Sequence, residues 1–471
     1  MRRTSESRSR QILDLPLDVR TQEKAKADKA PCVEEGRLAT YRPDGRNVQR
    51  FLALLSKRMN RRLALSMTGC VHCGLCADSC HYALVFPDDP QMTPVAKADR
   101  IRKIFKRHMD WTGRIAPWWV GAKRPSDDAD LNELKNVAFG LCSACRRCTF
   151  NCPMGVDTAG LIRFTRGLLT SLGIVPEGIF NVSRDQWDTG NQMGVSEADY
   201  LETLAWMRDE VRTELGTDAV DIPIDKDGCD FLYVINPREI KFDPRSIGQA
   251  VKIFHLAGES WTMPRWGWDN TNFGLFSGDD ALGAFVADNV YEAAARLKAK
   301  RIVISECGHG FRSTRWEGYG WAGRDQDVPS ESVVVSLERW LREGRLRVDP
   351  SRNALPVTFH DSCNIARSGG LTEEPRRVLQ RVCSDFREMT PNRTENYCCT
   401  GGGGLLSMAE YRPIRLEAAS IKARQLEATG AKLVCTMCHN CIDGLNDVIK
   451  HYNLDLKVVQ VLELVDKALL V

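Results

Sequence analysis

The sequence lacks any apolar run long enough to cross a membrane. No window of the 471 residues approaches the ~18 uninterrupted apolar positions that a spanning helix needs. Arginines and serines open the chain, but no apolar stretch follows them, so neither a secretory nor a twin-arginine signal is complete. We therefore expect a cytoplasmic protein, in which thiols stay reduced and available as metal ligands.

The patterns of several ligand-binding classes are also missing. The formal net charge is only +3, and no basic stripe is interleaved with aromatic residues, so we expect no nucleic-acid partner. No flavin or nicotinamide fingerprint occurs. Residues 401–404 are four glycines, but no lysine follows them, which argues against a phosphate-binding loop. The remaining composition, 43% hydrophobic and 27% charged, is typical of a folded globular protein.

Cysteine is abundant, with 18 residues, and two runs share the spacing C-x2-C-x2-C-x3-C. In such a run three thiolates surround one cubane, and the fourth ligates the other cluster. Two zinc knuckles are the alternative, but zinc sites are usually built from separated C-x2-C pairs. We therefore expect two [4Fe-4S] cubanes, one on Cys70, Cys73, Cys76 and Cys152, and the other on Cys142, Cys145, Cys148 and Cys80.

A third set of cysteines lies near the C-terminus and comprises Cys363, Cys398, Cys399, Cys435 and Cys438. Cys363 follows a predicted strand and Cys435 ends another, so both lie at the carboxyl edge of a parallel sheet, where such sheets bind ligands. The glycines after Cys399 permit positive φ and close backbone approach, which leaves amide groups free to point at cluster sulfurs. Five cysteines exceed the four of a cubane, which favours an open, non-cubane [4Fe-4S] cluster.

Two histidines flank this third set. His360 precedes Cys363 and His439 follows Cys438. Imidazole has a pKa suited to delivering protons to a leaving thiolate, so both are candidate catalytic proton donors. Ordinary core or supporting roles remain the alternative for each of them.

The remaining pattern predicts five regions. Residues 1–62 form an N-terminal helical extension with a basic amphipathic helix over 46–62, and 63–184 form a helical two-cluster ferredoxin domain. In that domain Thr93 and Pro94 open one predicted helix, and Asp157 caps another. Residues 185–228 are predicted as a linker with one short helix. Strands, predicted over 231–235, 301–305, 357–361, 432–435 and 458–461, alternate with helices afterwards, which indicates parallel sheets flanked by helices. We expect two α/β cysteine-rich repeats, over 229–350 and 351–471.

The two α/β repeats are related by an offset of 128 residues. This offset aligns Cys307 with Cys435, but it places Gly310 at Cys438, Ile235 at Cys363, and Asn270-Thr271 at the adjacent pair. One cysteine cannot hold a cluster, so we expect only the second repeat to bind one. His309, beside Cys307, is a remnant, a proton donor or an ordinary capped histidine.

The segments HDSCNIAR, NYCCTGGGG and CTMCHNCIDG carry the third cysteine set. They resemble the cysteine-rich domain of heterodisulfide reductases, in which that pattern binds a non-cubane four-iron cluster. The paired ferredoxin runs and duplicated domains, over about residues 63 to 471, resemble the fused catalytic subunit of that family. They also resemble the cytoplasmic iron–sulfur subunits of transmembrane redox complexes in sulfate-reducing and sulfur-oxidising bacteria. The resemblance implies a helical ferredoxin domain.

These observations predict an iron–sulfur oxidoreductase, with three possible roles. In the first, the cubanes deliver electrons to the third cluster, which reduces or forms a disulfide of a small molecule or small protein. In the second, the chain only relays electrons to a membrane cytochrome b or quinone module, and it docks through Trp111, Trp118 and Trp119. In the third, it serves a flavin-dependent hydroxyacid dehydrogenase whose flavin lies on a partner. We expect a peripheral location on the inner face of the cell membrane.

Overall fold

Two compact units make up residues 38–470, the part of the chain that the computed structural model describes. Unit 1 contains residues 38–181, 275–279 and 400–421, and unit 2 contains 182–274, 280–399 and 422–470. The chain therefore returns to unit 1 twice after entering unit 2. Cys32 and most of the predicted N-terminal extension lie outside the described residues.

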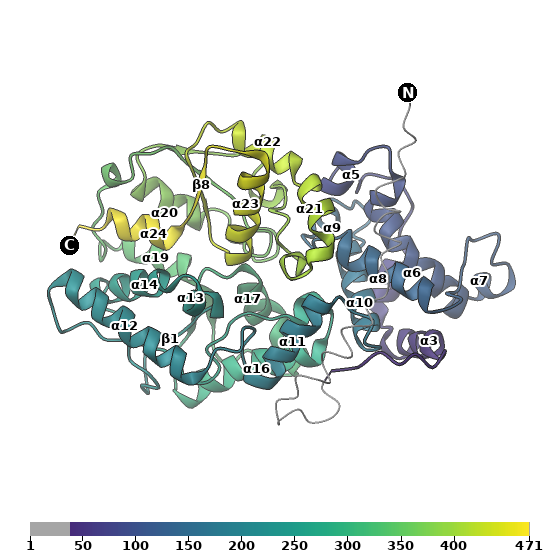
Figure 1. The fold of residues 1–471 in the computed structure, drawn as a ribbon, viewed down its shortest axis with the longest axis horizontal. Coiled ribbons are helices and arrows are strands. Elements are labelled where there is room, and N and C mark those ends of the chain that lie inside the picture. The colour runs from purple at the N-terminus through teal and green to yellow at the C-terminus, as the bar shows by residue number, and fades with distance from the viewer. Residues whose placement is uncertain (1–37, 471) are drawn as a thin grey trace. The chain divides into compact units, whose positions relative to one another are not determined.

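Unit 1 is helical, and its described residues contain no strand. α6, α8 and α10 pack on one another (Figure 1). This arrangement confirms the predicted helical ferredoxin domain. The helices are α3 (Asn47–Arg58), α4 (Arg61–Thr68), α5 (His81–Val85), α6 (Pro94–Met109), α7 (Trp111–Ile115), α8 (Asp128–Gly140), α9 (Arg147–Phe150), α10 (Thr158–Thr170), α15 (Gly274–Ser277) and α21 (Arg412–Ala418).

Two predicted helix starts in unit 1 are confirmed. Thr93 Oγ1 accepts a hydrogen bond from Ala96 N at 3.3 Å and caps α6, which begins at a proline. Asp157 Oδ1 accepts one from Gly160 N at 3.0 Å and caps α10. Thr158, the first residue of α10, lines both of the cysteine cavities described below.

The basic helix predicted over 46–62 is two helices. α3 ends before Met59, whose backbone is extended, and the side chain of Asn60 then caps α4 by accepting from Leu63 N at 2.9 Å. Phe51 and Leu55 of α3 are fully buried in the core of unit 1. The apolar face of α3 is therefore covered by its own unit.

Unit 2 contains two four-stranded parallel sheets. Their strand orders are β2-β1-β3-β4 and β6-β5-β7-β8, so the second sheet repeats the connectivity of the first. The predicted fold class, a duplicated α/β domain behind a helical ferredoxin domain, is confirmed. The strands are β1 (Phe231–Val234), β2 (Trp261–Thr262), β3 (Ile302–Ile304), β4 (Ser330–Ser332), β5 (Val357–Phe359), β6 (Phe386–Arg387), β7 (Leu433–Thr436) and β8 (Lys457–Gln460).

The helices of the two repeats pack on one another and share one continuous apolar core. α14 packs against α24, and α20 packs against both α19 and α24. The helices are α11 (Glu177–Thr189), α12 (Glu197–Leu215), α13 (Pro237–Lys241), α14 (Pro244–Leu256), α16 (Asp280–Arg296), α17 (Gly308–Arg312), α18 (Gly318–Ala322), α19 (Val333–Arg342), α20 (Glu374–Val382), α22 (Ser420–Glu427), α23 (His439–Tyr452) and α24 (Val461–Ala468).

The segment 185–228, predicted as a linker, is part of the unit 2 core. It contains the 19-residue helix α12, which packs on α14 (Figure 1). Tyr200, Leu204 and Met207 of α12 are buried in the same apolar core as the strands. The prediction failed because these apolar residues are widely spaced among charged ones, whereas only one face of the helix needs to be apolar.

The register of the sheets corrects the alignment of the two repeats. Val234 pairs with Ile304 in the first sheet, and Phe359 pairs with Cys435 in the second, so Ile304 is the counterpart of Cys435. Cys307 precedes α17 as its N-cap residue, just as Cys438 precedes α23. Cys307 therefore corresponds to Cys438. The fixed offset misplaced it because insertions differ between the repeats.

Candidate functional site

Each predicted cubane ligand set lines a cavity of its own in unit 1. Arg102 and the first set of cysteines line one cavity, and Lys97 and the second set line the other. In both cavities, the fourth cysteine comes from the opposite run in the sequence. The first cavity contains Cys70, Cys73, Cys76 and Cys152, and the second contains Cys80, Cys142, Cys145 and Cys148.

The two cysteine runs have the same backbone conformation. His72 and Gly74 in the first run, and Ala144 and Arg146 in the second, all have positive φ values between 52° and 83°. These residues occupy equivalent positions between the cysteines. Left-handed residues at fixed intervals turn the backbone around one point, so that successive thiols face the same centre. Equal spacing in the sequence therefore produces equal loops.

Buried cations accompany both cavities. Lys97, which is 4% exposed, places its Nζ 3.9 Å from Cys80 Sγ. Arg102 is also buried, and two of its guanidinium nitrogens, Nε and Nη2, have no hydrogen-bond partner among the described residues. Burial raises the pKa of the Cys148 thiol well above its ordinary value, so a thiolate there requires a bound cation. Unsatisfied donors facing thiols fit an anionic iron–sulfur cluster.

The glycine-rich loop after Cys399 belongs to unit 1 and packs on the second cysteine run. Gly403 has a φ of +66°, and a Cβ atom added there would lie 2.7 Å from the backbone of Ser143, which follows Cys142. Arg166 Nη1 donates to Gly403 O at 2.7 Å, and its Nη2 donates to Cys142 O at 2.7 Å. The predicted close backbone approach is thus present, but it is made to the ferredoxin loop.

The third cysteine set converges at the carboxyl edge of the second sheet in unit 2. Cys435 lies in β7, the neighbour of β5, and Cys363 follows β5. Cys438 is the N-cap residue of α23. All five cysteines of this set, including the adjacent pair Cys398 and Cys399, are at most 9% exposed. A set of thiols this deeply buried is suited to holding a metal cluster.

A sixth cysteine lies among these ligand candidates. Cys441 Sγ is 3.3 Å from Cys399 Sγ, and Cys441 also hydrogen-bonds to Cys438. The hydrogen bond from Cys441 lowers the pKa of Cys438 well below its ordinary value, whereas the same contacts raise the pKa of Cys441. Cys438 therefore gives up its proton more readily than Cys441, whose S–H donates to Cys438. The spacing Cys435-x2-Cys438-x2-Cys441 in the sequence was the signal for this residue.

His360, one of the two predicted proton donors, lies among these thiols. Ligand atoms of His360, Cys399 and Cys441 all lie within 4.8 Å of one another. Burial and the charge of Lys422 lower the pKa of His360 well below its ordinary value, so the imidazole is neutral. As a neutral ring it has one donor nitrogen and one acceptor nitrogen.

Asn396 and Lys422 determine which nitrogen of His360 carries the proton. Asn396 Nδ2 donates to Asp361 O, a carbonyl that can only accept, at 3.2 Å, and Lys422 Nζ donates to Asn396 Oδ1 at 2.8 Å. The Asn396 amide group therefore faces His360 Nδ1, 3.2 Å away, as a donor. His360 Nδ1 must accept, so the proton is on Nε2, a buried atom with no other partner among the described residues.

His439 faces the first repeat. Its Nε2 lies 3.1 Å from Glu239 Oε1, and its backbone N–H donates to Glu306 O at 3.1 Å. The first repeat also approaches the thiols through Gly308, where an added Cβ atom would lie 3.1 Å from Cys438 Sγ. His309, which hydrogen-bonds to Cys438, completes this wall. The first repeat thus forms one side of the third site.

Two protein families match separate parts of the chain. The family described as "4Fe-4S dicluster domain" matches residues 66–156, and the family described as "Cysteine-rich domain" matches residues 357–445. A protein of Archaeoglobus fulgidus named "Hdr-like menaquinol oxidoreductase iron-sulfur subunit 2" is 30% identical over 389 residues, which cover 74% of this chain and 69% of that protein. The chain belongs to the family of Hdr-like iron–sulfur subunits.

Two other relatives of this Hdr-like chain show the range of the similarity. One subunit of the "Dihydromethanophenazine:CoB--CoM heterodisulfide reductase" of Methanosarcina mazei is 26% identical, and the alignment covers 88% of this chain and 97% of that protein. The "EtfAB:quinone oxidoreductase" of Syntrophomonas wolfei is 24% identical, with 86% of this chain and 58% of that protein covered. The chain is an oxidoreductase component, and its dicluster domain implies two [4Fe-4S] cubanes.

The sequence did not identify several residues of these sites. Asn396 and Lys422 carry no motif, and Glu239 belongs only to the capping box of α13, so the fold alone brings these residues to the third site. Lys97 and Arg102 lie on α6 within a run of basic residues that resembles a solvated face. Their burial alone distinguishes them from the surface cations around them.

Proposed function

We propose that this Hdr-like chain catalyses thiol–disulfide redox chemistry at the third site, with electrons supplied through two cubanes in unit 1. The observation that carries the proposal is the third site itself, which has more thiols than a cubane needs. The neutral imidazole of His360 lies among the same thiols and has a buried Nε2 with no partner among the described residues. The heterodisulfide reductase named among the relatives supports this chemistry.

The proposed cubane ligands follow the crossed pattern, because each predicted set lines one cavity. The proposed ligands of the third cluster, which we infer to be non-cubane, are Cys363, Cys398, Cys399, Cys435 and Cys438. Cys441 stays protonated in this assignment and donates its S–H to Cys438. The first repeat, with Cys307 as its one thiol at this position, supplies a wall and no cluster.

When bound, the clusters would supply one-electron carriers and an iron atom able to take a substrate sulfur. Reduction of a disulfide RSSR′ consumes two electrons and two protons and releases RSH and R′SH. His360 Nε2–H is oriented to donate a hydrogen bond to sulfur in this site, because Asn396 holds its other nitrogen as an acceptor. The neighbouring Lys422, whose pKa burial lowers to about 7, can exchange a proton near neutral pH.

We further propose that the chain works as a subunit of a membrane-associated quinone oxidoreductase complex. The name of the Archaeoglobus fulgidus relative supports a menaquinol-linked partner. No helix within residues 38–470 is long and apolar enough to cross a membrane, so a quinone site in the bilayer would belong to another subunit.

A pure electron relay is the second candidate, and the same menaquinol oxidoreductase name favours it. In that case the third cluster passes electrons onward and converts no substrate. A flavin-linked role is the third candidate, which the relative from Syntrophomonas wolfei supports. Co-purification separates these cases, since a flavoprotein partner is expected only for the third.

Iron content tests the third site. Anaerobically reconstituted protein should hold about twelve irons, and Cys398→Ser/Cys399→Ser should hold about eight while keeping the ferredoxin-type signals. Cys383→Ser, a buried cysteine outside the three sites, is the matched control and should keep the full iron content. An unchanged iron content in the double variant would show that the third site is wrong.

A spectroscopic experiment separates thiol chemistry from the relay. Oxidised protein given a cognate thiol should develop a new paramagnetic signal that iron-57 broadens, because the unpaired spin then lies on the cluster. His360→Ala should keep the iron content but slow turnover of the thiol. If no thiol induces a signal, and the protein in its complex is nevertheless reduced rapidly by a quinol, the relay is correct.

A further inference from the structure

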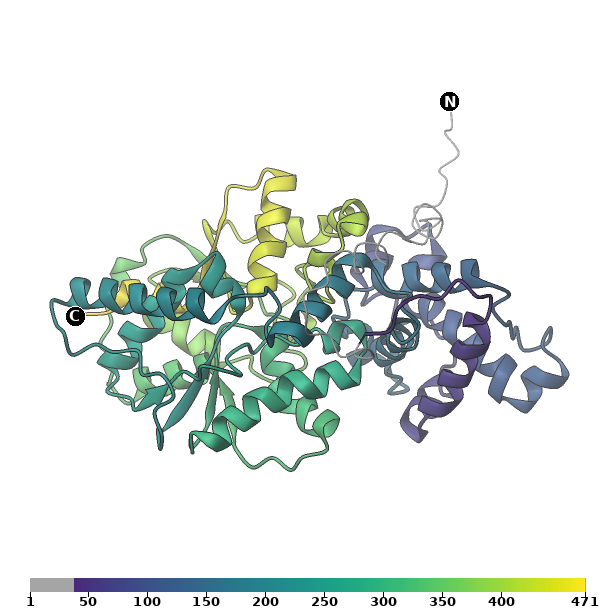
Figure 2. The same ribbon diagram turned by 60° about the horizontal axis from the view of Figure 1, so that its bottom comes forward.

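The segment that follows α6 in unit 1 exposes large apolar side chains. Trp111 is 72% exposed, Ile115 69%, and Trp118 and Trp119 are each 81% exposed. α7 and the turn after it stand out from α6 and α8 of the same unit (Figures 1 and 2). Three exposed tryptophans on one protruding turn are unusual in a monomeric surface, where such patches mark interaction sites.

This protruding turn is held firmly at its base. A Cβ atom added at Gly113 would lie 2.1 Å from Lys106 O, so α7 packs directly on the end of α6. Arg114 donates to His108 O from both Nε and Nη2, at 3.0 Å and 2.6 Å. Lys123 N donates to Lys103 O at 3.2 Å and returns the chain to α6. The tryptophans are therefore presented on a defined scaffold.

Basic residues surround the turn. Residues 100–125 contain eight lysines and arginines, of which Arg102 is buried, and one acidic residue, Asp110. A depression of about 240 Å³ opens beside the turn, and it is lined by Arg100, Lys103, Lys123, Arg124, Pro125, Asp130, Glu133 and Leu134, with Ile104 at its base. This excess of positive charge favours an anionic partner.

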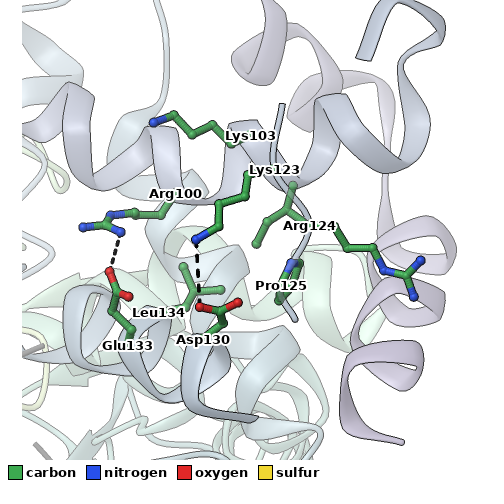
Figure 3. Close-up of a pocket in the computed structure, with 9 residues that line it drawn as sticks. Arg100, Lys103, Lys123, Arg124, Pro125, Asp130, Glu133 and Leu134 are labelled. Atoms are coloured by element: carbon green, nitrogen blue, oxygen red, sulfur yellow. Dashed lines mark hydrogen bonds and ion pairs between the residues drawn. The ribbon is translucent and has the colours of Figure 1, made fainter. Parts of the chain in front are cut away.

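Two cations of the depression are not neutralised. Arg100 pairs with Glu133, and Lys123 Nζ lies 4.0 Å from Asp130 Oδ1. Figure 3 shows the charged ends of Lys103 and Arg124 pointing away from both carboxylates. Neither of these two side chains forms an ion pair with a described residue, and both are exposed. They are thus available to bind phosphate groups.

We propose that this surface, the α7 turn with its basic depression, docks the protein on an anionic phospholipid bilayer. The indole rings of Trp111, Trp118 and Trp119 enter the headgroup region, and Lys103 and Arg124 bind lipid phosphates. Tryptophan beside lysine and arginine is the composition of membrane-interface anchors, because indole prefers that region and the cations are attracted to anionic lipids. The proposal is independent of the chemistry at the third site.

Vesicle co-sedimentation of the anaerobic holoprotein tests the proposal. Vesicles of phosphatidylcholine containing one third phosphatidylglycerol should bind the protein, and vesicles of phosphatidylcholine alone should bind it much more weakly. Trp118→Ala/Trp119→Ala should weaken binding by at least about ten-fold, because two apolar rings leave the headgroup region. Lys103→Gln/Arg124→Gln should weaken binding about thirty-fold at low ionic strength, and this difference should largely vanish in about 0.5 M salt.

Two matched controls isolate the surface. Trp206→Ala removes an exposed tryptophan from unit 2, and Lys298→Gln/Lys300→Gln removes two exposed charges there. Both control proteins should bind as the unchanged protein does. Equal binding by the Trp118→Ala/Trp119→Ala protein would overturn the proposal. Binding only to vesicles that carry a membrane protein partner would also overturn the proposal, because the surface would then bind that protein and not the lipid.

Discussion

Arg166 offers the sharpest test of how unit 1 is held together. Its guanidinium is fully buried and donates to four backbone carbonyls, those of Ala138 and Phe276 at 2.9 Å and those of Gly403 and Cys142 at 2.7 Å. These acceptors belong to segments far apart in the sequence. We expect Arg166→Met to destabilise unit 1 and to loosen the loop that carries the second cysteine run.

Two opposing contributions set the size of this effect. Hydrogen bonds to a charged donor contribute about 1.5 to 3 kcal/mol each, so four of them contribute roughly 6 to 12 kcal/mol before costs. Burial lowers the pKa of Arg166 to about 10, which corresponds to about 3 kcal/mol of charge burial. Partial rehydration of the carbonyls reduces the difference further, so we expect Arg166→Met to lose about 4 kcal/mol of unfolding free energy. Arg166→Lys should lose about half as much, roughly 2 kcal/mol, since an ammonium cannot reach all four carbonyls.

Anaerobic urea unfolding, followed by circular dichroism and by visible iron–sulfur absorption, measures this loss. Arg58→Met is the control, because Arg58 is exposed and donates only one bond, to Gly167 O at 3.1 Å. The control should change the unfolding free energy by less than about 1 kcal/mol. If Arg166→Met behaves like Arg58→Met and keeps its iron, the four hydrogen bonds do not hold the unit together.

Three further predictions concern the ligands and a buried carboxyl. Cys80→Ala should remove iron from the cluster of the Cys142 run and leave the cluster of the Cys70 run intact, and spectra of the two clusters measure this. Loss of only the cluster of the Cys70 run would disprove the crossed assignment. Cys441→Ala should keep all iron but lower the potential of the third cluster by on the order of 40 mV, the equivalent of one hydrogen bond of about 1 kcal/mol, and an unchanged redox titration would contradict its role as a donor. Burial raises the pKa of the Asp269 carboxyl from 3.8 to about 7. Between these two pH values the folded protein retains a proton that the unfolded chain releases. The free energy of unfolding should therefore fall by about 2 to 4 kcal/mol as the pH rises through this range. Asp269→Asn should flatten that slope in unfolding experiments between pH 5 and about 8, and an identical slope would exclude this carboxyl as its source.

Local spacing in the sequence was sufficient to predict much of the fold. The two cysteine runs, the caps at Thr93 and Asp157, and the strands β1, β3, β5, β7 and β8 were all identified from short stretches of the chain. Each of these features depends on residues within about one turn or one strand of each other, so no distant contact is needed to specify it. The edge strands β2, β4 and β6 were missed, since two or three residues carry too little periodicity to be recognised.

Only the tertiary structure decided what surrounds the thiols. The equivalence of Cys307 and Cys438 depends on strand register, and the proton position on His360 depends on Lys422, 62 positions away in the sequence. The polar character of α12 concealed its place in the core of unit 2. Contacts of this kind follow from burial and packing of segments distant in the chain, and a single sequence contains no local signal for them. The cysteines and their spacing were thus determined by the sequence, while their polar partners were determined by the fold.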